Sequence, residues 1–178
     1  AGSVLPVTTT VTVDAGATFD VSGFGHTIAG LDGTGSVKVN GVSKLAVTNS
    51  FALTGTLTGI GDVVVSGLTP GANGAAFTGT FTIAEKACIG VTDPDGVINT
   101  LVLGGRLVLP KEATVTWARG TNGGRYVLAK AASIEVPDGG LQWTDKSGSP
   151  LKNLTVVAGD TSSELRLTIG TGTAIYLR

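Results

Sequence analysis

Apolar and polar residues alternate with a period of two along most of this chain. A strand with this pattern turns its apolar side chains to one face and its polar side chains to the other. No stretch keeps a 3.6-residue apolar period over three turns, so helix is predicted to be nearly absent. The residues predicted to point inward are Val11 and Val13; Ala17, Phe19 and Val21; Val37 and Val39; Leu45 and Val47; Phe51 and Leu53; Val63 and Val65; Phe81 and Ile83; Leu101 and Leu103; Leu107 and Leu109; Val115 and Trp117; Tyr126 and Leu128; Ile134 and Val136; Leu141 and Trp143; Leu154 and Val156; Leu165, Leu167 and Ile169; and Ile175 and Leu177.

Turn-forming sequences such as Asp14-Ala15-Gly16 and Pro137-Asp138-Gly139-Gly140 separate these strands. The strands recur about every 8–12 residues, a spacing typical of β-sandwiches, β-barrels and solenoids. Glycine accounts for 28 of the 178 residues but follows no three-residue period, which excludes collagen. Glycine suits sharp corners, and threonine suits the surface of a strand. The sequence therefore predicts an all-β fold of many short strands.

The length of the chain predicts a single domain over residues 1–178, long enough to bury a core. Charge divides it into two parts. Residues 1–89 carry three basic and five acidic side chains, whereas residues 90–178 carry nine and eight, together with both tryptophans. We expect residues 1–89 to form a regular repeat and residues 90–178 to form a more elaborated or capping part.

The stretch from Val11 to Val47 reads VTVDAGATFDVSGFGHTIAGLDGTGSVKVNGVSKLAV. It resembles the repeat of autotransporter-associated β-strand proteins, and the segment Phe77–Ile83 is similar to a second part of that repeat. The resemblance implies a right-handed parallel β-helix, a solenoid, on a secreted or surface-displayed protein. It fades beyond Thr92, so a β-sandwich or jelly roll remains the alternative, particularly for residues 90–178. The matching positions are Gly16-Ala17, Asp20, Gly23-Phe24, Thr27-Ile28, Leu31, Gly33, Gly35 and Val37.

Motifs for catalysis are missing from the sequence. There is no G-x-S-x-G or phosphate-binding glycine loop, and one histidine, His26, with one cysteine, Cys88, cannot build a zinc site. The sequence thus predicts no enzyme, no cofactor and no metal. If the protein did cleave polysaccharides, Glu135, Asp138 and Asp145 would be the first candidate carboxylates. Cys88 lies in an apolar stretch, which predicts a buried, inert thiol.

Binding partners are constrained by charge and by aromatic residues. A net charge of −1 gives no footprint for nucleic acid, and apolar runs are too short for membrane insertion. Aromatic rings beside arginines could hold a surface glycan, although strand spacing favours core packing for both tryptophans. The candidate glycan-binding residues are Trp117, Arg119, Arg125, Tyr126 and Trp143.

The small residues Ala1-Gly2-Ser3 resemble those that follow signal-peptide cleavage, so we expect a secreted or cell-surface protein whose signal peptide has been removed. A rod of stacked strands exposes strand edges at its two ends, and these must be capped or used. The favoured hypothesis is a structural subunit that self-associates through the solenoid ends into an extracellular filament or surface layer. A surface adhesin that binds carbohydrate is the first alternative, and a polysaccharide lyase-like enzyme is the second.

Overall fold

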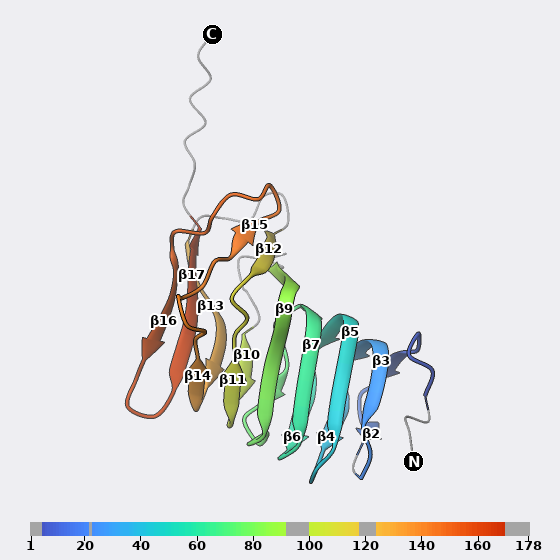
Figure 1. The fold of residues 1–178 in the computed structure, drawn as a ribbon. Coiled ribbons are helices and arrows are strands. Elements are labelled where there is room, and N and C mark those ends of the chain that lie inside the picture. The colour runs from blue at the N-terminus through green and yellow to red at the C-terminus, as the bar shows by residue number, and fades with distance from the viewer. Residues whose placement is uncertain (1–4, 22, 92–99, 118–123, 170–178) are drawn as a thin grey trace.

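The protein is all-β in a computed structural model, which describes residues 5–21, 23–91, 100–117 and 124–169 (Figure 1). None of these residues is helical. Sheet A has nine strands: β1 (Thr10–Val13), β3 (His26–Gly33), β5 (Lys44–Leu53), β7 (Asp62–Leu68), β9 (Thr80–Val91), β11 (Arg106–Val108), β12 (Ala113–Trp117), β14 (Ser133–Glu135) and β15 (Thr144–Asp145). Sheet B has eight strands: β2 (Thr18–Asp20), β4 (Ser36–Val39), β6 (Thr56–Gly59), β8 (Asn73–Gly74), β10 (Leu101–Leu103), β13 (Gly124–Ala131), β16 (Leu154–Ala158) and β17 (Ser163–Ile169).

Pairing in sheet A is parallel throughout the described residues, and no strand of the sheet pairs with the strand that directly precedes or follows it in the chain. The inward residue Leu45 is aligned with Val63, Val63 with Phe81, Phe81 with Leu107, and Leu107 with Ile134. The chain therefore passes repeatedly through sheets A and B in turn. Each pass places apolar side chains directly above those of the pass before.

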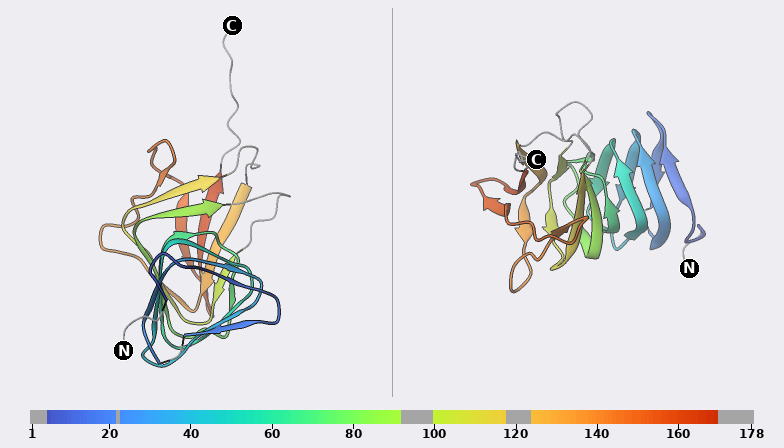
Figure 2. Two further views of the ribbon diagram at one scale, coloured as in Figure 1. Left: turned by 90° about the vertical axis from the view of Figure 1, so that its right-hand side faces the viewer. Right: turned by 90° about the horizontal axis from the view of Figure 1, so that it is seen from above.

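The long strands of sheet A bend, which gives the sheet two faces. In β9, Thr80–Thr82 pairs with β11, whereas Ala87–Val91 pairs with β12. Face 1 contains the first parts of β3, β5, β7 and β9, with β11 and β14, and face 2 contains their last parts, with β1, β12 and β15. Sheet B is face 3. Seen along the stack of strands, the ribbon of the first half has a roughly triangular outline (Figure 2, left).

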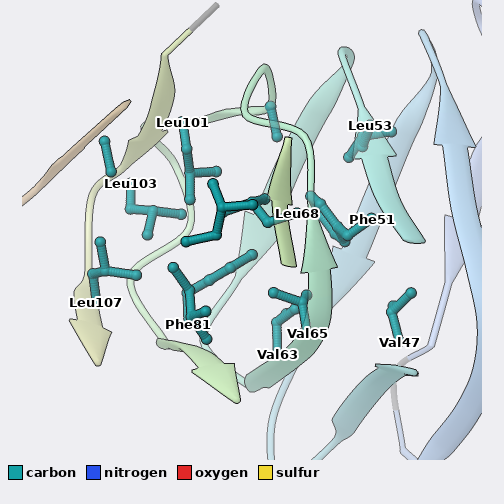
Figure 3. Packing of buried hydrophobic residues seen from close by; sticks show 14 of the residues in the cluster. Val47, Phe51, Leu53, Val63, Val65, Leu68, Phe81, Leu101, Leu103 and Leu107 are labelled. Atoms are coloured by element: carbon teal, nitrogen blue, oxygen red, sulfur yellow. The ribbon is translucent and has the colours of Figure 1, made fainter. Parts of the chain in front are cut away.

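The core lies between the three faces and consists of one continuous cluster from Val13 to Leu167. Its largest fully buried side chains include Phe51 and Phe81, whose rings meet edge to face at 5.4 Å (Figure 3). The period-two alternation predicted most of this cluster. In β4, β5, β7, β9, β10 and β11, nearly every residue that was predicted to point inward is buried. The predictions for Ala17 and Val136 are wrong, since both side chains are exposed where a strand gives way to a turn. Ile175 and Leu177, and the side chain of Ile169, lie outside the described part.

Threonine on the outer surface links one pass of the chain to the pass before it. The hydroxyl groups of Thr48, Thr54 and Thr58 donate hydrogen bonds to carbonyl groups of the preceding strands, those of Ile28, Gly33 and Val37. The distances from the threonine Oγ1 atoms to the carbonyl oxygens are 3.2–3.4 Å. These three threonines thus stabilise the contact between successive passes of the chain.

The prediction that Cys88 is buried is wrong. Ala87 and Ile89 point into the core, so the period of two places Cys88 on the outer surface of face 2, where it is exposed. The apolar stretch around it contains both inward residues and outward residues of low polarity.

The second half departs from the regular pattern only at its end. β10, β11, β12, β14 and β15 continue the parallel pairing, which a separate sandwich would not do. β17 then pairs antiparallel with β13, and β16 pairs antiparallel with β17. The later strand, β17, is thus inserted between β13 and β16. The extra charge of this half includes ion pairs between neighbouring strands, Arg106–Glu135 at 3.0 Å and Lys130–Glu164 at 3.0 Å.

Candidate functional site

The two ends of the stack are the first candidate site. At the N-terminal end, β1 has β3 as its neighbour and β2 has β4; at the other end, β14 has β11 and β16 has β17. Each of these strands has a neighbour on one side only among the described residues. An edge strand of this kind offers backbone N–H and C=O groups to another chain.

Strand direction is the same at both ends. β16 is antiparallel to β17, which is antiparallel to β13, so β16 runs in the same direction as β13. β13 in turn is parallel, strand by strand, to β2. The hairpin β16–β17 therefore restores the parallel direction at the outer edge of sheet B.

The edge strands differ from one another in composition. β1 reads TVTV and β16 reads LTVVA, so neither carries a charge or a proline. In contrast, β2, β14 and β15, which among the described strands pairs with β12 alone, each carry one carboxylate. Natural proteins commonly place lysine, proline or a bulge on an edge that must stay unpaired. The composition of β1 and β16 instead suits pairing with another strand.

The core is closed differently at its two ends. At the N-terminal end, Val11 and Phe19 are half-buried, and Val7 is 60% exposed. At the C-terminal end, Trp143 is 2% exposed and its indole Nε1 donates a hydrogen bond to the Pro110 carbonyl at 3.0 Å. Leu141 and Leu151 also pack against the core there. The segment around Trp143 thus covers one end of the core.

The five residues predicted to bind a glycan do not form one platform. Trp143 and Tyr126 belong to the core, so the Trp143 ring offers no face for stacking. Arg125 is exposed on β13, and Arg119 lies outside the described residues. Trp117 is half-buried at the end of β12, where it lines a groove. Of the aromatic residues predicted, Trp117 is thus the one placed at a surface hollow.

The carboxylates named as catalytic candidates have structural contacts. Glu135 pairs with Arg106, and Asp138 is exposed in a turn. Asp145 accepts hydrogen bonds from the hydroxyl and backbone N–H of Ser147 and from the backbone N–H of Ser149, at 2.6–2.9 Å. These bonds, led by that from the Ser147 side chain, lower the pKa of Asp145. No group of three or more histidine, cysteine or carboxylate side chains gathers in the described part of the chain.

Two grooves meet at Pro150, on the surface of the second half. The larger, groove 1, has a volume of about 570 Å³, and the smaller, groove 2, about 320 Å³. Groove 1 is lined by Lys86, Glu112, Ala113, Thr114, Leu141, Gln142, Thr144 and Pro150. Groove 2 is lined by Trp117, Pro150, Leu151, Lys152, Asn153, Leu167 and Thr168.

Backbone contacts fix the wall of groove 1. Lys86 has φ of 61°, the one positive φ among the described residues other than glycine, and its N–H donates to the Glu112 carbonyl at 2.8 Å. The Glu85 carboxylate accepts from the N–H groups of Lys111 and Glu112 at 3.1 and 2.7 Å. The bend of β9 is thereby tied to the start of β12. Sequence reasoning missed this groove, because its residues come from segments more than fifty positions apart and share no motif.

Comparisons of the chain with protein-family models, with curated proteins and with solved structures find no match. Within the described residues, no helix is long and apolar enough to cross a membrane.

Proposed function

We propose that this chain is a right-handed parallel β-helix that serves as a structural protein outside the cell, with its copies joined end to end in a filament or surface layer. The observation that carries the proposal is that β2 and β16, the edge strands at opposite ends of sheet B, run in the same direction.

The β-helix is supported by the register of the parallel strands. Residues on successive passes are aligned on all three faces, and the passes share one core. Parallel strands in one sheet need crossover connections, and such connections are right-handed in about 98% of cases. A right-handed coil with three faces accounts for this arrangement.

End-to-end joining follows from strand direction. When β2 of one copy is laid beside β16 of another with both stacks pointing the same way, the new pair is parallel and continues sheet B. β2 carries Asp20 and β16 carries no charge, so this pair contains no like-charge contact. The joined surfaces are different on the two partners, and an interface of this kind that does not close into a ring produces a filament.

The experiment is sedimentation velocity over a series of protein concentrations, followed by electron microscopy of the fastest fractions. The test variant is Val157→Glu, which places a negative charge at an exposed position of the free edge strand β16, whereas β2 of the next copy carries the exposed Asp20. The matched control is Val42→Glu, at a turn position between β4 and β5 that is 99% exposed and lies outside both joined edge strands. We expect the unmodified protein and Val42→Glu to form rods that lengthen with concentration.

Rods of Val157→Glu should remain shorter at every concentration while its thermal unfolding stays unchanged. A monomer that stays dispersed at high concentration would refute the proposal. So would equal assembly of the two glutamate variants.

A further inference from the structure

We propose that grooves 1 and 2 together bind an acidic oligosaccharide, with one carboxylate-bearing sugar in each groove. This inference goes beyond end-to-end assembly and does not depend on it, because the grooves are built within one copy.

Each groove contains one lysine, one side-chain amide and at least one threonine. Groove 1 has Lys86, Gln142, Thr114 and Thr144, and groove 2 has Lys152, Asn153 and Thr168. Amide and hydroxyl groups can each donate and accept hydrogen bonds, as sugar hydroxyls do. The same set occurs on both sides of Pro150, which suits a ligand with a repeating unit.

The two lysines favour an acidic ligand over a neutral one. Among the described residues, every ion pair within 4.0 Å involves Asp20, Glu135 or Glu164, and neither Lys86 nor Lys152 takes part. Both lysines are exposed, and of the described residues that line either groove, Glu112 is the one with an acidic side chain. The ammonium groups are therefore available for carboxylates of a ligand.

Trp117 supplies the apolar surface that a sugar ring needs. Its indole is half-buried beside Lys152 and Asn153 in groove 2. An indole face packs against the C–H face of a sugar while the ring hydroxyls reach the polar side chains around it. Leu141, Ala113 and Pro150 provide apolar contacts in groove 1.

The grooves are preorganised. Trp143 anchors their shared loop in the core, and the Leu151 N–H donates to the Trp143 carbonyl at 2.9 Å. Asp145 holds the turn before Pro150 through Ser147 and Ser149. Lys86 is held with positive φ, a strained conformation for a non-glycine residue that clusters at ligand-binding positions.

The experiment uses the whole chain labelled with an environment-sensitive dye at its single cysteine, Cys88. This thiol is exposed, and Cys88 is aligned with Thr114 of groove 1 on the neighbouring strand. The labelled protein is titrated with an oligogalacturonate of defined length. The matched ligand is the same oligomer with its carboxylates methyl-esterified, and a DNA oligonucleotide of equal charge is the third probe.

Lys86→Gln and Lys152→Gln should each raise the dissociation constant for the acidic oligomer by about tenfold, and the double variant by about a hundredfold. Trp117→Ala should raise it by about tenfold as well. Lys111→Gln is the matched control, because Lys111 is exposed and nearby but lines neither groove. We expect this variant to bind as the unmodified protein does.

Three outcomes would overturn the inference: no saturable binding of the acidic oligomer, equally tight binding of the esterified oligomer, or equally tight binding of DNA. Equal losses in Lys111→Gln and Lys86→Gln would overturn it too. The Val157→Glu variant, which is expected to be impaired in assembly, should bind the oligomer as the unmodified protein does. Failure of assembly and failure of binding are thus measured separately.

Discussion

Glycine at the corner before β6 is predicted to be essential for close stacking of the chain. A Cβ atom built on Gly55 would lie 1.9 Å from the carbonyl oxygen of Gly35, in the pass before it. Real Cβ contacts stay above 3.0 Å, so Gly55→Ala requires the two backbones to separate. The same carbonyl accepts the Thr56 N–H at 3.0 Å, and separation weakens that hydrogen bond.

The expected loss of stability can be worked from these contacts. Overpacking of a tight site costs about 1–3 kcal/mol, and the weakened hydrogen bond adds about 0.5–1.5 kcal/mol. Gly55→Ala should therefore lower the free energy of unfolding by about 2–4 kcal/mol. For a chain of this length, that corresponds to a decrease in Tm of about 5–15 °C.

The control is Gly25→Ala. The nearest atom to a Cβ at Gly25 is the Lys44 carbonyl oxygen at 3.8 Å, an ordinary contact, and its φ lies outside the left-handed region. This variant should lie within about 1 kcal/mol of the unmodified protein, and on the stable side, because alanine restricts the unfolded chain. The measurement is urea unfolding followed by circular dichroism. If both variants unfold at the same denaturant concentration, the close approach at Gly55 does not limit stability and the reasoning is wrong.

Three further predictions concern Trp143, Cys88 and Asp145. Trp143→Phe should lower the free energy of unfolding by about 1–3 kcal/mol in urea titrations, because the buried Pro110 carbonyl loses its donor, whereas Trp117→Phe should change it by less than half as much. Cys88 should react with a maleimide in the folded protein as fast as in urea, which mass spectrometry can follow; strong protection would contradict its exposed position. The pKa of Asp145 is lowered in the folded state, so its contribution to stability is present above its unfolded pKa, near 3.9, and is lost as the pH falls through the folded pKa. Asp145→Asn should therefore be less stable than the unmodified protein at neutral pH, and the difference should shrink in acid; a difference that is constant from neutral to acidic pH would contradict this role.

The strands of the core were readable from the sequence where two inward residues occur in one strand. Leu45 and Val47 in β5, and Val63 and Val65 in β7, are examples, and all four are buried. Leu57 and Phe77 are also fully buried but were missed. The second inward position of β6 is a glycine, Gly59, and Phe77 lies outside the named strands. A period of two cannot be recognised from one residue.

The residues predicted to bind a glycan show that the sequence pattern is also insufficient to locate a binding site. The sequence selected Trp117 and Trp143 by residue type, yet one lines a groove and the other closes the core. Both follow an inward residue by two positions. Whether each tryptophan ring is buried or lines a groove depends on which segment lies above it. That in turn depends on contacts between distant parts of the chain.

The sequence by itself determined the all-β class and most of the inward-facing residues, because alternation acts within a few neighbouring residues. Its glycines and turn sequences also marked corners. Only the tertiary structure decided the parallel order of the strands, the reversal of direction at β17 and the meeting of Lys86 with Gln142 and Pro150. These features depend on which strand edges pair across tens of residues. Local periodicity is the same for parallel and antiparallel strands, so it does not show which kind of pairing a strand will form.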